Sequence, residues 1–112
     1  MKEITLDKLK TILDQQKNSS QRIIVDVRTE EEHQESYLLG SVNIPLDVIE
    51  HSIDLLNSYQ EIYFYCRSGN RSKRACEILK ERGFKEVTLI SINGKREDWE
   101  KNRLPIVRQS LH

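Results

Sequence analysis

A cysteine stands at the end of an apolar run, directly before a basic loop that contains a glycine. The stretch EIYFYCRSGNRSKRACEILKERGF, residues 61–84, places Cys66 next to Arg-Ser-Gly-Asn-Arg. A short loop of this kind can curl around its first residue, and Gly69 supplies the positive-φ freedom that the curl needs. Backbone N–H groups from Arg67 to Arg71 can then converge into an anion-binding nest at the start of a helix.

We expect this loop to hold Cys66 as a thiolate. A helix N-terminus and neighbouring cations favour the ionised form of a cysteine, and Arg67 and Arg71 supply two positive charges. The predicted chemistry is attack by Cys66 on an anionic substrate, with a covalent cysteine intermediate. A buried structural cysteine is the weaker alternative, because the neighbours of Cys66 are polar and charged. For Cys76, on the following helix, core packing is favoured over a role as a resolving thiol.

The elements that must position this loop alternate along the chain. Apolar runs predict strands at residues 2–6, 22–27, 40–45, 61–66 and 86–90. Helical spacing predicts helices after Thr5, over 46–56, over 71–82 and around 96–101. A capping box at Thr29–Glu32 predicts one more short helix. For the helix at 71–82, Ser72 is the expected N-cap and Gly83 the expected C′ residue. This alternation predicts an α/β domain with a mostly parallel sheet.

Binding sites in such sheets lie off the carboxyl ends of the strands, where the loops at 26–28, 66–71 and 91–94 should gather. Asp26 and Arg28 are therefore expected to support the site. Arg71 is either a pocket cation or a partner of Asp26, and the ion pair is favoured. Arg28 is expected to pair with Glu31 or Glu32.

Other polar side chains receive more modest roles. Arg67 is either a rim residue that attracts the substrate or a solvated arginine. Ser72 is first a helix cap and only secondarily a hydrogen-bond partner of sulfur. Trp99 is expected in the core, whereas His33 and His51 are expected in solvent.

Composition bounds the function further. The chain has 112 residues and a formal net charge of zero, which predicts one domain and argues against nucleic-acid or membrane-surface binding. The N-terminus has no secretory signal, and the longest apolar run, IYFYC, is far too short to span a membrane. Two cysteines and three histidines do not form a zinc pattern. We expect a monomeric cytoplasmic protein without metal or organic cofactor.

The sequence resembles the rhodanese (sulfurtransferase) family. CRSGNRS and the following KRACEILKERGF are similar to the family's active-site loop and helix, IIVDVRTEEEHQESYLLGSVNIPL to its Asp-Val-Arg and Gly-x-x-Asn-Ile-Pro segments, and NGKREDWEKNRLPIV to its last segment. Ser36 and Tyr37 replace the usual Gly-His, and Lys95 and Arg103 replace common glycines. These departures lie outside the cysteine loop.

The resemblance implies a three-layer fold with five parallel strands and helices on both faces, over a domain core of about residues 3–107. It also implies that Cys66 carries a persulfide held by the backbone amides of Arg67, Ser68, Gly69, Asn70 and Arg71. The expected donor is thiosulfate or another small sulfur anion, and the expected acceptor is a thiol, a thioredoxin-like protein, or cyanide in an assay.

Two other functions stay open from the sequence. Phosphatases and arsenate reductases of related architecture place five residues between cysteine and arginine, whereas four separate Cys66 from Arg71. The shorter loop favours a sulfur atom over a tetrahedral phosphate. A non-catalytic interaction module is disfavoured, since inactive members of the family typically lack the cysteine.

Overall fold

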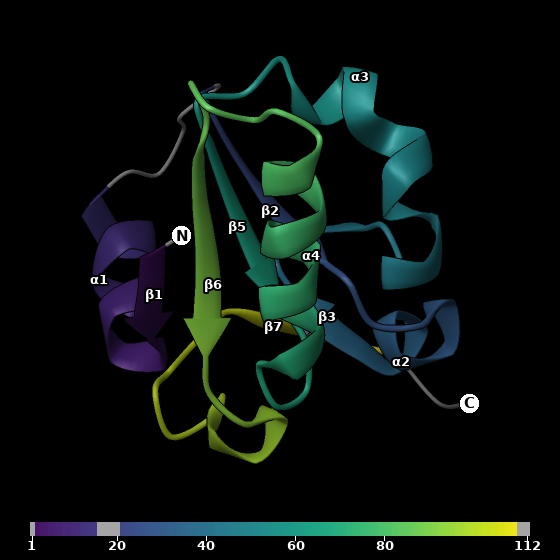
Figure 1. Ribbon diagram of the computed structural model, residues 1–112. Helices are drawn as coiled ribbons and strands as arrows, with labels where there is room; N and C mark the ends of the chain where they lie inside the picture. Colours follow the sequence, from purple (N-terminus) through teal and green to yellow (C-terminus); the bar gives the residue numbers. More distant parts are fainter. Residues whose placement is uncertain (1, 16–20, 110–112) are drawn as a thin grey trace.

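The computed structural model describes residues 2–15 and 21–109. Its centre is a parallel sheet of five strands in the order β1-β6-β5-β2-β4 (Figure 1). The strands are β1 (Lys2–Thr5), β2 (Arg22–Asp26), β4 (Val42–Asn43), β5 (Glu61–Tyr65) and β6 (Thr88–Asn93). The predicted parallel α/β sheet is therefore confirmed, and the carboxyl ends of its strands share one edge.

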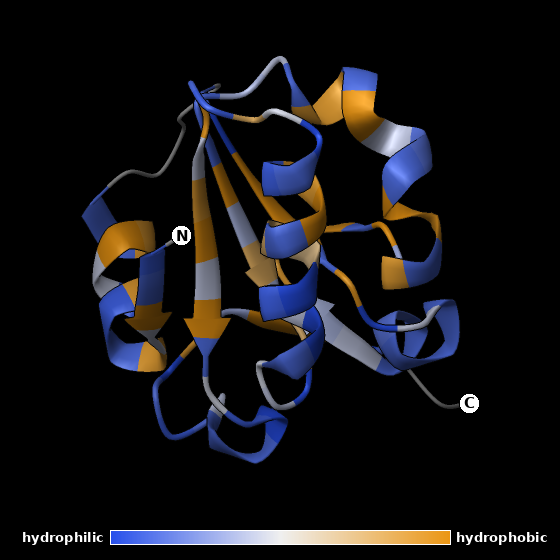
Figure 2. Cartoon of the chain, in the orientation of Figure 1, coloured by the Kyte–Doolittle hydropathy of each residue, from blue (hydrophilic) through white to orange (hydrophobic). Residues whose placement is uncertain are grey.

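Helices cover both faces of this sheet. The helices η1 (Leu46–Ser52), α3 (Ile53–Leu56) and α4 (Asn70–Glu81) pack on one face, and α1 (Leu6–Gln15) packs with the C-terminal segment on the other. Successive strand residues point to opposite faces, so Phe64 joins the first core cluster while Tyr63 and Tyr65 join the second. Figure 2 shows the apolar strands enclosed by helices with hydrophilic outer faces.

The other helical segments lie where the sequence predicts helices, but two of them differ from the prediction in helix type or length. The helix α2 (Glu30–Glu35) begins with the predicted capping box, in which the Thr29 side chain accepts from the Glu32 amide and Glu32 bonds back to Thr29. Residues 46–56 form a 3₁₀ helix followed by one α-helical turn, instead of a single α-helix. The helix expected at 96–101 is only the short 3₁₀ segment η2 (Arg96–Asp98).

A second, two-stranded sheet was not predicted. Strand β3 (Ser36–Leu38) pairs antiparallel with β7 (Ile106–Arg108), with Tyr37 opposite Val107. Each strand is three residues long, which is too short for a pattern of alternating apolar residues to identify it. This pairing brings the C-terminal segment beside α2, near the carboxyl edge of the main sheet (Figure 1).

A search of the described ranges finds no helix with the length and apolar character needed to cross a membrane.

Candidate active site

Cys66 lies directly after β5, at the carboxyl edge of the main sheet. Its side chain is in the core cluster beneath α4, and the residue is 2% exposed. The three-residue turn from Arg67 to Gly69 leads from the cysteine into the N-terminus of α4. The Arg67 carbonyl accepts a hydrogen bond from the Arg96 amide, 2.9 Å away, so the loop is attached to η2 after β6.

The loop curls back on the cysteine as the glycine predicts. Gly69 has φ +99° in the left-handed region and is the N-cap residue of α4. In this conformation its N–H donates to Cys66 Sγ over 3.0 Å. A methyl group at position 69 would also contact Asn93 Oδ1 at 3.4 Å. Gly69 therefore combines the required backbone conformation with an amide directed at the sulfur.

Ser72 is not the N-cap, because α4 begins at Asn70, three residues earlier than that role requires. The positive φ of Gly69 turns the chain into the helix and places Ser72 at its third position. There its fully buried hydroxyl donates to the Gly69 carbonyl over 2.8 Å. The same hydroxyl lies 3.8 Å from Cys66 Sγ and 2.9 Å from the hydroxyl of Ser91 on β6.

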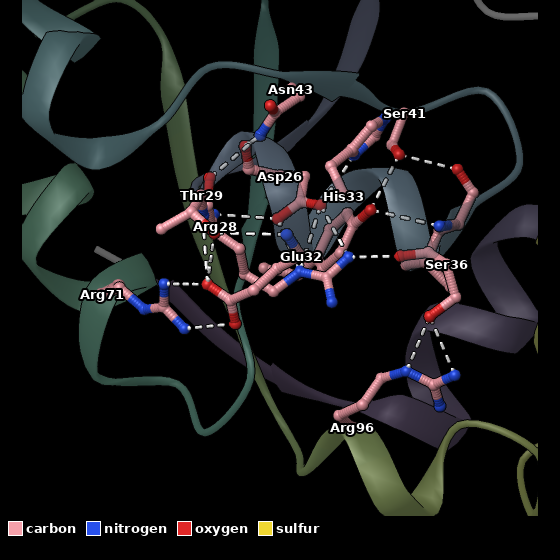
Figure 3. A network of polar contacts seen from close by, with 12 residues as sticks. Asp26, Arg28, Thr29, Glu32, His33, Ser36, Ser41, Asn43, Arg71 and Arg96 are labelled. Atoms are coloured by element: carbon pink, nitrogen blue, oxygen red, sulfur yellow. Dashed lines mark hydrogen bonds and ion pairs between the residues drawn. The ribbon is translucent and has the colours of Figure 1, made fainter. Parts of the chain in front are cut away.

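The ion pairs differ from those expected. Arg71 binds Glu32 of α2 through two parallel hydrogen bonds of 2.7 and 3.0 Å, so its partner is Glu32 and not the expected Asp26 (Figure 3). The hydrogen bonds from Arg71 lower the pKa of Glu32 to about 2. The same hydrogen bonds raise the pKa of Arg71. The negative charges of Cys66 and Asp26 make smaller contributions to this rise. The capping box fixes Glu32 for this pairing, a link across 39 positions that sequence spacing does not reveal.

Arg28 binds Asp26, and the expected pairing with Glu31 or Glu32 is wrong. The Arg28 guanidinium donates to both carboxylate oxygens over 2.8–3.1 Å, and the Arg28 amide adds a bond of 2.9 Å. The chain turns at the end of β2, so residues two apart can meet. Both side chains are buried, at 0% exposure for Asp26 and 3% for Arg28. They form a structural pair at the end of β2, the strand that neighbours β5 (Figure 3).

His33 joins the same carboxylate and is not solvated as expected. Its Nδ1 lies 2.8 Å from Asp26 Oδ2, and its ring stacks on Tyr37 with centroids 4.3 Å apart. The His33 side chain lies on the face of α2 that is directed toward Asp26. The charged residues next to it in the sequence gave no sign of this orientation. His51, in contrast, is exposed as predicted.

Trp99 is a core residue, as predicted, and links the last segment to the site. It is 1% exposed, and the guanidinium carbons of Arg28 and Arg96 lie 5.1 and 4.5 Å from its ring centroid. Arg96 also donates to the Ser36 hydroxyl over 3.0 and 3.1 Å. Ser36 is one of the departures from the family pattern, but its contact with Arg96, 60 positions away, was not predicted from the sequence.

The remaining predicted residues divide between rim and core. The side chain of Arg67 is 66% exposed and approaches Glu97 at 3.6 Å, which places it at the rim. Ser68 and Asn70 are exposed beside it. Cys76 is buried as expected, and burial raises the pKa of its thiol to about 12. It therefore lacks the properties of a reactive thiol.

Two of the cavities in the described structure lie at opposite ends of the main sheet. A cleft of about 130 Å³ lies beside Arg71 and is lined also by Val27, Thr29, Pro45, Leu46 and Asp47. A much larger cavity of about 1060 Å³ includes Gln21, Tyr59 and Thr88 at the amino ends of the strands. The small cleft therefore lies on the same side of the sheet as Cys66, whereas the large cavity lies at the opposite end.

Comparison with known proteins places this geometry in a family. Residues 5–102 match the rhodanese-like domain family. The chain is 38% identical over 97 residues to YrkF of Bacillus subtilis, named as a candidate sulfur carrier protein, a match that covers 87% of this chain and 50% of YrkF. The chain thus spans about half the length of that relative.

Two further relatives match over most of their length. YtwF of Bacillus subtilis, named as a candidate sulfurtransferase, is 35% identical over 82 residues, which cover 73% of this chain and 77% of YtwF. A rhodanese-like domain protein of Staphylococcus aureus of known structure is 35% identical, with a TM-score of 0.69 and coverage of 88% of this chain and 91% of that chain. The cysteine loop, the parallel sheet and these matches show that the chain belongs to the rhodanese-like domain family.

Proposed function

We propose that this chain transfers sulfane sulfur through a persulfide on Cys66. Relatives named as sulfurtransferases support sulfur transfer in general. The observation that carries the proposal for this chain is the Gly69 N–H, 3.0 Å from Cys66 Sγ at the N-terminus of α4. An amide and a helix N-terminus directed at one atom stabilise negative charge on that atom.

The reaction has two half-reactions. In the first, the Cys66 thiolate attacks the outer sulfur of a donor such as thiosulfate, the S–S bond of the donor breaks, and sulfite leaves with the electron pair. In the second, the Cys66 persulfide takes up a proton, and an acceptor thiolate attacks its outer sulfur. The acceptor becomes a hydropersulfide and the Cys66 thiolate is restored. Alternation of a free and a covalently modified enzyme gives ping-pong kinetics.

The loop residues take supporting roles in this proposal. The backbone from Arg67 to Arg71, with the Ser72 hydroxyl, surrounds the persulfide, and Arg67 at the rim attracts a small anionic donor. Arg71 contributes less positive charge than the sequence predicts, because Glu32 balances it at 2.7 Å. A thiol or a thioredoxin-like protein is the proposed acceptor.

Intact-mass spectrometry after thiosulfate treatment tests the proposal. The wild-type chain and Cys76→Ser should each gain one sulfur atom, whereas Cys66→Ser should gain none. Cys76→Ser is the matched control because it removes the other thiol and leaves the loop intact. Sulfur on Cys76 would overturn the assignment of the nucleophile, and hydrolysis of a phosphate ester by a chain that takes up no sulfur would favour the phosphatase-like alternative.

A further inference from the structure

A buried pair of serine hydroxyls lies behind the cysteine and is not explained by packing alone. Ser72 and Ser91 are both 0% exposed, and their oxygens are 2.9 Å apart. Ser91 comes from β6, where its neighbours Ile90 and Ile92 pack into the opposite core cluster. A hydroxyl in such an environment must find a partner, since an unsatisfied buried polar group is costly.

The number of protons fixes the direction of these hydrogen bonds. Ser72 has one hydroxyl proton but three neighbours, namely the Gly69 carbonyl, Ser91 and Cys66 Sγ. The Gly69 contact requires Ser72 as the donor, because a carbonyl only accepts. Within the described residues, the hydroxyl of Ser91 has one hydrogen-bond partner, which is Ser72. Ser91 therefore donates to Ser72, and Ser72 donates elsewhere.

This arrangement gives the Ser72 proton two acceptors. With Cys66 protonated, Ser72 donates to the Gly69 carbonyl, and its oxygen can accept from the thiol, 3.8 Å away. With Cys66 ionised, the proton can rotate to the sulfur. The Gly69 carbonyl still accepts the Lys73 amide at 3.1 Å, so this rotation leaves no carbonyl unpaired. Ser91 keeps donating in both cases and makes Ser72 a better donor through cooperativity.

We propose that Ser91 is a positioning residue, which turns the Ser72 hydroxyl toward the Cys66 sulfur whenever that sulfur carries negative charge. The Cys66 thiolate of the reaction proposed above carries this negative charge before it attacks the donor, and the charge forms again when the acceptor removes sulfur. This inference rests on the proposed function for its role in turnover, but its effect on Cys66 ionisation is independent of any substrate.

Ultraviolet absorbance of the thiolate as a function of pH tests the proposal. The measurements use the Cys76→Ser background, so that only Cys66 contributes. Ser91→Ala and Ser72→Ala should each move the midpoint of Cys66 ionisation upward by about 0.5 to 1 pH unit, the effect of one buried hydrogen bond. The double variant should show no more than the shift of Ser72→Ala alone, because Ser91 acts through Ser72. Ser91→Thr, which keeps the hydroxyl, should retain most of the wild-type midpoint.

The charged groups around the thiol are the same in all these variants. They are Arg67 and Arg71 on the loop and α4, and Glu32 and Asp26, whose charges act on Arg71 together with that of Cys66. Ser58→Ala is the matched control, because Ser58 also donates to a carbonyl three positions earlier but lies far from Cys66 at the amino end of β5. It should leave the midpoint unchanged.

Turnover supplies the second measurement. Ser91→Ala should lower the rate of sulfur transfer by about two- to tenfold, again only when Ser72 is present. Independent, additive shifts in the double variant would show that Ser91 does not act through Ser72. An unchanged midpoint in Ser91→Ala with a lowered melting temperature would show that Ser91 only fills space. Either result would overturn the proposal. Failure of the wild-type chain to take up sulfur would overturn the proposed function and leave the ionisation result to stand by itself.

Discussion

Substitution of Asp26 by asparagine should destabilise this domain more than loss of any exposed ion pair. The Asp26 carboxylate is fully buried, and it accepts from the Arg28 amide and guanidinium and contacts His33. Asparagine keeps the size of the side chain but removes the charge, so Arg28 is left as a buried, uncompensated cation. Breaking a buried pair in this way costs about 3–5 kcal/mol, out of roughly 5–15 kcal/mol for a whole domain. With a typical slope of about 2 kcal/mol per molar urea, the unfolding midpoint should fall by about 2 M.

Urea unfolding followed by circular dichroism measures this loss. Asp14→Asn is the control, because it removes an exposed ion pair with Lys10 and should cost less than about 1 kcal/mol. The double variant Asp26→Asn/Arg28→Met should be more stable than Asp26→Asn, since it removes the unpaired charge as well. A loss for Asp26→Asn as small as that of the control, or a double variant weaker than either single one, would refute the charge-burial explanation.

Three further predictions follow from the site and its surroundings. The folded-state pKa of Glu32, about 2, lies below its ordinary value of 4.5, so the pair with Arg71 stabilises the fold above pH 4.5 and this contribution is lost as the pH falls toward 2. The free energy of unfolding should therefore depend less on pH across this range in Glu32→Gln than in the wild type. The variant of exposed Glu31, Glu31→Gln, should follow the wild type. Gly94→Ala would place a methyl carbon 2.3 Å from Leu6 Cγ, which should cost about 1–3 kcal/mol in thermal unfolding; no recovery on combination with Leu6→Ala would contradict this clash. Cys76, 1% exposed with a pKa of about 12, should resist iodoacetamide at pH 8 until urea is added, and rapid labelling of the native chain at Cys76 would contradict its assignment to the core.

The sequence predicts the parts of this domain that depend on local chemistry. The apolar runs around Ile24 and Phe64 identified the central strands, and Gly69 identified the turn that brings an amide to Cys66. The pairing of charges was predicted wrongly, because it depends on which side chains a fold brings together. Arg71 reaches Glu32 only after the fold brings α2 to the N-terminal end of α4, and neighbouring Glu30 and Glu31 are carboxylates that the sequence cannot distinguish from Glu32.

Ser91 shows the same limit within a strand. The sequence predicted a strand that ends at residue 90 with Ser91 in the following loop, whereas β6 extends from Thr88 to Asn93 and its register beside β5 places Ser91 behind the cysteine loop. The resemblance to a family implied the architecture, which the parallel sheet confirms, and it implied Cys66 as the nucleophile, which stays a prediction.

The antiparallel pairing of β3 with β7 has a consequence for synthesis of the chain. All five strands of the main sheet precede Ile106, whereas Ser36–Leu38 must wait for Ile106–Arg108 before its backbone is paired. A chain that lacks Ile106–Arg108 therefore contains every strand of the main sheet but leaves β3 as an open edge, the kind of surface at which chains associate. Synthesis that stops after Pro105 and releases the chain should yield a product more prone to aggregation than a chain that includes β7.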